Sequence, residues 1–123
     1  MAKLEVNVID VKKQIKELQL YRSGWGNDIR EKWNGGIQGA KELTFDLYQI
    51  SGCIILALQE TIHGRFQDKM AMLLVKRKLL SLTHSPNYQN LDKMGQKGLC
   101  NTVTTETKHH IRIMMECLNL LTA

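Results

Sequence analysis

Proline is nearly absent from this chain. Pro86 is the single proline among 123 residues, and the stretch from Ile37 to Leu82 contains none. A proline inside a helix removes a backbone hydrogen bond and clashes with the preceding turn, so this stretch is free to form long helices. The sequence therefore predicts an all-α fold. We expect one domain over residues 1–123, a small helical bundle built on a long antiparallel helical hairpin, with short N-terminal and C-terminal helices packed on it.

Apolar residues recur every three or four positions in several parts of the chain, the spacing that places side chains on one face of a helix. The first helix is expected to begin near Ile9, with Asp10 as its N-cap, and to end in the glycine-containing turn at 23–28. The longest apolar stripe extends over 37–62. The last helix is expected to begin near Thr104.

Glycine and proline divide the second half of the chain. The pattern of the long helix is interrupted at His63 and Gly64 but resumes beyond them, which fits either a break or a kink, and we favour a break. Residues 83–87 form the clearest linker, because Pro86 disfavours helix at the residue before it. One or two helical turns are expected after the linker, ending at Gly95.

Two small residues lie within the longest predicted helix. Glycine costs about 1 kcal/mol relative to alanine in a helix interior, so Gly52 is predicted to mark the point where another helix crosses closely. Cys53 opens the apolar run 53–58, where a reduced thiol acts as a small hydrophobic side chain. With Cys100 and Cys117 the cysteines are odd in number and lack C-x-x-C spacing, so we expect no disulfides and a reducing compartment.

The overall charge is moderately basic. Seventeen Lys and Arg against twelve Asp and Glu give a formal net charge of +5, which favours acidic partners. The first ten residues lack the pattern of a cleavable signal peptide. The longest uncharged stretch, Leu47 to Gln59, is shorter than the roughly 20 residues needed to span a bilayer. We therefore expect a soluble protein without a membrane span that is cytoplasmic at least initially.

Residue types used in metal and catalytic sites occur without the spacing that such sites need. His109, His110 and Cys117 do not form a paired-ligand motif with Cys100, which precedes the final helix. No cysteine is followed by a recognisable nucleophile signature, and the glycines of 35–39 lack the Lys-Ser/Thr of a phosphate-binding loop. We expect no metal, no cofactor and no enzymatic activity.

A short basic cluster is the best candidate for binding nucleic acid. Three cations are consecutive, and two more precede them by one to three helical turns, where they could bind phosphates. Consecutive residues of a helix point in three different directions, and cations near a helix C-terminus also suit its dipole, so a solvated face is the favoured interpretation. The alternative nucleic-acid site consists of Arg65, Lys69, Lys76, Arg77 and Lys78.

The two tryptophans, Trp25 and Trp33, lie in adjacent glycine-rich corners. A large ring at such a corner can plug a helical hairpin or stand exposed as an anchor for a partner, and a core plug is the favoured interpretation. Trp33 and Gly35 form a Trp-x-Gly motif ahead of the longest helix. Tyr88 and Asp92 form a Tyr-x-x-x-Asp motif after the second long apolar pattern.

These two motifs resemble those of the small WxG family of type VII secretion substrates. The segments 4–11 and 54–60 are in addition similar to the N-terminal helical domain of LxG effectors. The resemblance implies that the Trp-x-Gly motif forms the corner between two helices. It also implies that Tyr88 and Asp92 form an exposed recognition feature.

From the helical pattern and this resemblance we expect a non-enzymatic protein–protein interaction module, with Trp25, Trp33, Gly35, Tyr88 and Asp92 at the interface. Its predicted role is that of a type VII secretion substrate or an adaptor for one, and its predicted partner is a protein, in a homodimer or a heterodimer. The alternative is a basic helical protein that binds nucleic acid, or a viral or phage accessory protein that antagonises a host factor.

Overall fold

A computed structural model describes residues 7–24, 40–96 and 101–123 of the chain. Within these ranges all regular structure is helical, which confirms the all-α fold class. Trp25, Trp33, Gly35 and Cys100 lie outside the described residues. The helices are α1 (Val8–Gly24), α3 (Ala40–Ile62), α4 (Lys69–Thr83), α5 (Pro86–Gln96) and α6 (Asn101–Leu121).

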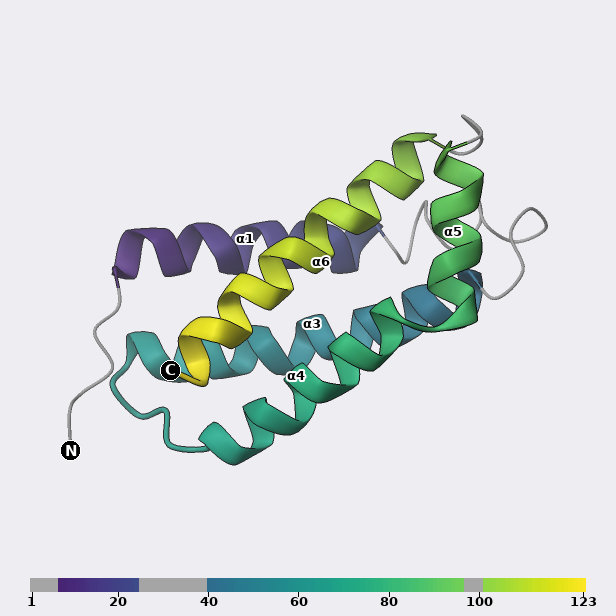
Figure 1. The fold of residues 1–123 in the computed structure, drawn as a ribbon. Coiled ribbons are helices and arrows are strands. Elements are labelled where there is room, and N and C mark those ends of the chain that lie inside the picture. The colour runs from purple at the N-terminus through teal and green to yellow at the C-terminus, as the bar shows by residue number, and fades with distance from the viewer. Residues whose placement is uncertain (1–6, 25–39, 97–100) are drawn as a thin grey trace.

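Helix α6 occupies the centre of the described bundle, where it contacts α1, α3, α4 and α5. Figure 1 shows α6 running diagonally across the molecule, with α1 on one side, α4 on the other, α3 behind it and α5 across one end. The sequence predicts short terminal helices, whereas α1 has 17 residues and α6 has 21. Helix α6 is longer and more central than predicted because its buried positions extend from Thr104 to Leu121 and pack against several neighbours.

The start of α1 is fixed by Asn7. Its side-chain Oδ1 accepts hydrogen bonds from the backbone N–H groups of Ile9 at 3.0 Å and Asp10 at 3.3 Å. Asn7 is therefore the N-cap, and the expectation that Asp10 has this role is wrong. Asp10 lies instead in the first turn of the helix, where a carboxylate interacts favourably with the helix dipole.

A break separates α3 from α4, as the sequence predicts. Gly64 has a φ of 69°, a left-handed conformation that glycine adopts without strain. Its N–H donates to the Thr61 carbonyl at 3.1 Å, and the next residue, Arg65, donates to the Glu60 carbonyl at 2.8 Å. This Schellman arrangement ends α3, and the Asp68 side chain then caps α4 by accepting from the Ala71 N–H at 3.1 Å.

The predicted linker at 83–87 is shorter in the structure, because Pro86 begins α5 instead of preceding it. Proline fits the first position of a helix, where no N–H is needed for an intrahelical bond. The Ser85 Oγ caps this start by accepting from the Tyr88 N–H at 3.3 Å. Helix α5 has 11 residues and continues through Gly95, so it is longer than the predicted one or two turns.

The hydrophobic core lies where α3 and α6 meet α1, with smaller contributions from α4 and α5. The apolar positions that predict the long helix are buried from Leu43 to Leu58. Burying a leucine of this kind stabilises a fold by about 1.5–3 kcal/mol. The largest fully buried side chains are Leu18, Tyr21, Leu43, Leu47, Ile54, Leu58, Leu79, Leu91, Met114, Leu118 and Leu121.

The two sides of α3 should differ sharply in their effect on stability. Leu58 is 0% exposed and Leu56 is 65% exposed on the same helix. Leu58→Ala is expected to lower the free energy of unfolding by about 2–5 kcal/mol because it leaves a cavity. Leu56→Ala is the matched control and should change it by about 0.5 kcal/mol or less. Urea unfolding measures both values, and equal losses would contradict the described packing.

Candidate protein-binding groove

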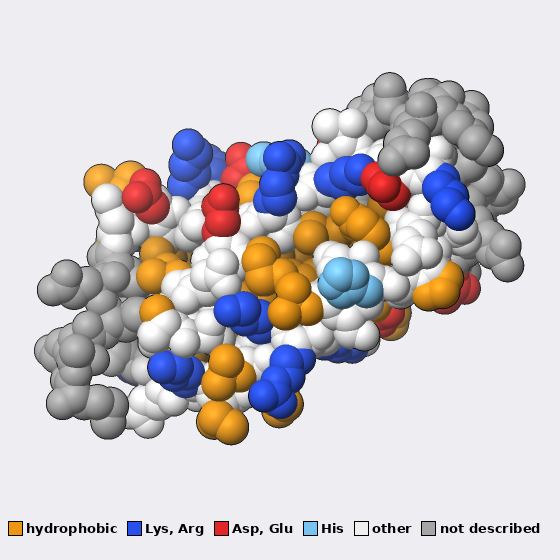
Figure 2. All heavy atoms as spheres, in the orientation of Figure 1, with side chains coloured by type: hydrophobic (Ala, Val, Ile, Leu, Met, Phe, Trp, Pro, Cys, Tyr) orange, Lys and Arg blue, Asp and Glu red, His pale blue; other side chains and the backbone are white. Residues whose placement is uncertain are grey.

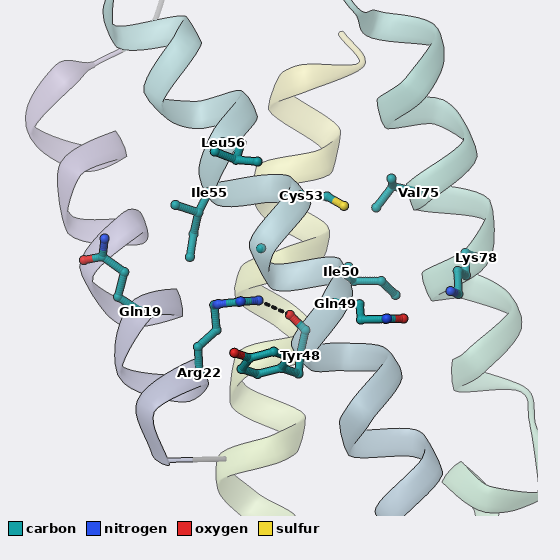
Figure 3. A pocket seen from close by; sticks show the side chains of 11 residues that line it. Gln19, Arg22, Tyr48, Gln49, Ile50, Cys53, Ile55, Leu56, Val75 and Lys78 are labelled. Carbon is teal, nitrogen blue, oxygen red and sulfur yellow. Dashed lines mark hydrogen bonds between the residues drawn. The ribbon is translucent and has the colours of Figure 1, made fainter. Parts of the chain in front are cut away.

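The side of α3 that faces away from α6 carries an open groove of about 790 Å³, bounded by α1 and α4. Figure 3 views this side, with α3 in front, α6 behind it and α1 and α4 on either side. Its size lies within the usual range for binding pockets. The lining consists of Gln19 and Arg22 from α1, Tyr48, Gln49, Ile50, Gly52, Cys53, Ile55 and Leu56 from α3, and Val75 and Lys78 from α4.

The outward-facing side of α3 combines apolar and polar residues, of which Gln49, Gly52 and Leu56 line the groove. Phe45, Gln49, Gly52 and Leu56 follow one another at intervals of four, three and four residues, which places them on one face. Phe45 is 45% exposed and Leu56 is 65% exposed, although both are large hydrophobic side chains. The sequence signal for this face is the apolar run 53–58, which is too wide for a single buried stripe.

Arg22 joins α1 to α3 at the edge of the groove. Its Nη1 donates a hydrogen bond to the backbone carbonyl of Tyr48 and lies 3.5 Å from the Ser51 Oγ. The Arg22 Cζ also lies 3.8 Å from the centre of the Tyr48 ring, a cation–π contact. Figure 3 shows the guanidinium above this ring and beside the backbone of α3. These contacts hold the guanidinium in one place.

Gly52 provides the space for this arrangement. A Cβ atom at position 52 would lie 2.5 Å from the Arg22 Nη1, closer than real contacts allow. The sequence predicts a helix crossing at Gly52, and the structure instead places a long side chain there. The prediction of a helix crossing at Gly52 is therefore wrong, because the group that approaches is a guanidinium and not the backbone of another helix.

The two described cysteines are in opposite environments. Cys53 is free and exposed in the groove, where it points toward Val75. Cys117 is fully buried in α6. Burial raises the pKa of the Cys117 thiol from 9.0 to about 12, with a smaller contribution from the charge of Glu116. The thiol of Cys117 therefore stays protonated near neutral pH.

Tyr88 and Asp92 lie on α5 and are half-buried, so the recognition feature that the resemblance implies is partly accessible. Tyr88 packs against the hydrophobic core. The Asp92 Oδ1 forms an ion pair with the Nζ of Lys108 on α6. The pair of residues thus contributes to the packing of α5 on α6.

The predicted basic cluster is dispersed in the structure. Arg65 forms a salt bridge with Glu60 at 3.1 Å, so its charge is partly compensated. Lys69 and Arg77 are exposed, Lys76 is half-buried, and Lys78 lines the groove on α3. On the face shown in Figure 2, Lys and Arg side chains are spread among hydrophobic and acidic ones and do not gather in one patch.

Buried polar side chains lie at the contact between α1 and α6. The rings of Tyr21 and His110 are 4.9 Å apart, and the His110 Nδ1 bonds the Glu106 carbonyl at 2.7 Å. The Tyr21 hydroxyl, the His110 Nε2 and the hydroxyls of Thr104 and Thr107 are buried, and the structure gives none of them a hydrogen-bond partner among the described residues. Burial raises the pKa of Tyr21, so its phenol stays neutral.

Comparisons with known proteins assign no family to this chain. No protein-family model matches the chain, and neither a curated protein nor a solved structure matches it. Among the described residues, no three His, Cys, Asp or Glu side chains come together in a way that could hold a metal ion. No helix in the same ranges combines the length and hydrophobicity that crossing a membrane requires.

The environments of the cysteines predict selective alkylation. In the native protein at about pH 8, Cys53 should react readily with iodoacetamide, whereas Cys117 should react only after unfolding in guanidinium, because its thiol is buried and protonated. Mass spectrometry of the peptides that contain each residue measures the two extents separately. Equal modification of both in the native state would contradict the described burial.

Gly52 and Arg22 should be energetically coupled. Gly52→Ala gains about 1 kcal/mol of helix propensity but displaces the guanidinium from its hydrogen bond to Tyr48, a loss of about 1–2 kcal/mol. In an Arg22→Ala background nothing is displaced, so the same substitution should stabilise the protein by the full propensity gain. A double-mutant cycle in urea measures the difference. An identical effect of Gly52→Ala in both backgrounds would rule out the coupling.

Proposed function

We propose that this protein is a helical protein–protein interaction module that accepts an amphipathic helix of its partner in the groove on α3. The observation that carries the proposal is the groove on α3, whose floor carries Leu56, a large hydrophobic side chain that is 65% exposed. Binding grooves are lined mostly by apolar side chains with a few polar groups, as this groove is. A groove between two helices, with a third as its floor, suits an amphipathic helix laid along it.

The composition of the groove supports a protein helix as the occupant. Leu56 and Ile55 provide apolar surface on the α3 floor, and Val75 extends it onto α4. Gln19 and Gln49 add amide groups that can bond polar side chains of a partner. An apolar floor with polar edges is the usual composition of a protein interface.

The alternative role, nucleic-acid binding through Arg65, Lys69, Lys76, Arg77 and Lys78, rests on the charge of α4. No acidic residue occurs between Lys69 and Thr83. The dispersion of these cations over different faces gives less support to a phosphate-binding stripe than the apolar groove gives to a protein partner. The narrower role in type VII secretion stays a prediction, because the Trp-x-Gly motif that carries it lies outside the described residues.

A neutral helical peptide tests the proposal. The probe is a synthetic amphipathic peptide of about 18 residues, long enough for five turns, with leucines on one face and glutamines on the other. In NMR titrations it should shift amide signals of Leu56, Cys53 and Val75 and leave exposed residues of α6 unchanged. Leu56→Glu should weaken binding at least about tenfold, because it places a charge on the apolar floor.

Two results would contradict the proposal. One is the absence of peptide-induced shifts in the groove, or shifts that persist unchanged in Leu56→Glu. The other is binding of a single-stranded oligonucleotide that weakens steeply with salt and is lost equally in Arg77→Glu and Lys78→Glu, which would favour the nucleic-acid role.

A further inference from the structure

We infer that the groove selects an acidic partner helix, whose carboxylates are received by Arg22 on the α1 side and Lys78 on the α4 side. This inference rests on the proposed function and specifies the chemistry of the partner. Arg22 and Lys78 lie on opposite edges of the groove (Figure 3). None of the described residues that line the groove is acidic. A helix with carboxylates on both sides of its apolar face matches this arrangement.

The α1 edge extends the positive charge. Lys12 and Lys16 are exposed, and they precede Gln19 by seven and three residues, which places them on the same face of α1 as this groove residue. The acidic Glu17 lies on a different face, where its Oε2 is 3.8 Å from the Nε2 of His109 on α6. The edge of α1 that adjoins the groove is therefore basic.

No acidic residue of α3 lines the groove, although Asp46 precedes Gln49 and Cys53 by three and seven residues and so lies on the same side of the helix as they do. Glu42 and Asp46 precede the lining residues, and Glu60 follows them. Glu60 is already paired with Arg65 at the far end of α3. Between these positions the groove presents amide, apolar and cationic groups.

The contacts of Arg22 with α3 preorganise its guanidinium for binding a carboxylate. Both hydrogen bonds that it makes with described residues use Nη1, and the stacking on Tyr48 fixes the plane of the guanidinium. A guanidinium has five N–H donors, so Nε and Nη2 can donate to an incoming oxygen while Nη1 keeps its contacts with α3. A guanidinium held in place loses little conformational freedom on binding, and it can bond a carboxylate through two parallel N–H groups on different nitrogens, a geometry that a single ammonium nitrogen does not offer.

The same charges disfavour a second copy of this chain as the occupant. Two such grooves placed face to face would bring the cations of one copy toward those of the other, and like charges across an interface are repulsive. The net charge of +5 adds to this repulsion. The groove is instead complementary to a partner of different sequence that carries an acidic amphipathic helix.

Three peptides with identical leucine faces test the inference, with Glu, Gln or Lys at the flanking positions. Fluorescence anisotropy at moderate salt should give the tightest dissociation constant for the Glu peptide, about tenfold below that of the Gln peptide, and the weakest for the Lys peptide. Lys78→Glu should remove most of the advantage of the Glu peptide. Arg77→Glu is the matched control, since it makes the same charge change at the next residue, which does not line the groove.

The outcomes separate the two proposals. Equal binding of the Glu and Gln peptides, or equal losses in Lys78→Glu and Arg77→Glu, overturns the acidic preference while leaving a groove for neutral helices. No groove binding by any peptide overturns both. Arg22→Lys keeps the charge but removes the planar guanidinium. It should weaken binding of the Glu peptide several-fold and have little effect on binding of the Gln peptide. Equal weakening of both would indicate a structural role only and would overturn the assignment of Arg22.

Cys53 provides a second measurement that needs no peptide, because its exposed thiol lies in the groove. The measured quantity is the ratio of the rates at which an anionic and a cationic methanethiosulfonate modify Cys53. This ratio should be higher in the wild type than in Lys78→Glu. Arg77→Glu should leave this ratio nearly unchanged. The inference of a local positive field in the groove would be contradicted if Lys78→Glu left the ratio unchanged, or if Lys78→Glu and Arg77→Glu changed it equally.

Discussion

The apolar face of α6 packs against all the other helices of the described chain, and the arrangement of those helices depends on that burial. Met114, Leu118 and Leu121 are almost completely removed from solvent. Because α6 covers the inner side of α3, the opposite side of α3 lies between α1 and α4 without a helix across it among the described residues. The central position of α6 therefore determines where the groove is.

The groove combines two physical properties that originate from different helices. Helix α3 supplies the apolar floor, since its hydrophobic residues outnumber those that one buried face can hold. Helices α1 and α4 supply the cations at the edges. Gly52 links the two properties, because the missing side chain lets Arg22 lie against α3 without covering Leu56. In the proposed complex, apolar contact would provide affinity and charge would provide selectivity.

Much of the fold could be predicted from local sequence features, whereas little of the candidate site could. The helix class, the buried positions of α3 and the break at Gly64 follow from hydrophobic spacing and glycine. The sequence pattern places Pro86 in a linker, whereas it begins α5 in the structure, because proline both ends and begins helices. The resemblance implies that Tyr88 and Asp92 are exposed, and the structure shows them half-buried because α5 packs on the core and Asp92 pairs with Lys108.

The sequence by itself determined that the described chain is helical, that α3 is apolar on a wide arc and that the charge is basic, because these properties depend on residues near one another in the chain. Only the tertiary structure decided which arc of α3 stays open and which cations adjoin it. Lys76, Arg77 and Lys78 are equivalent as a sequence cluster, and the orientation of α4 places only Lys78 in the groove. Arg22 joins it from 56 positions earlier in the chain because α1 and α4 flank the same helix.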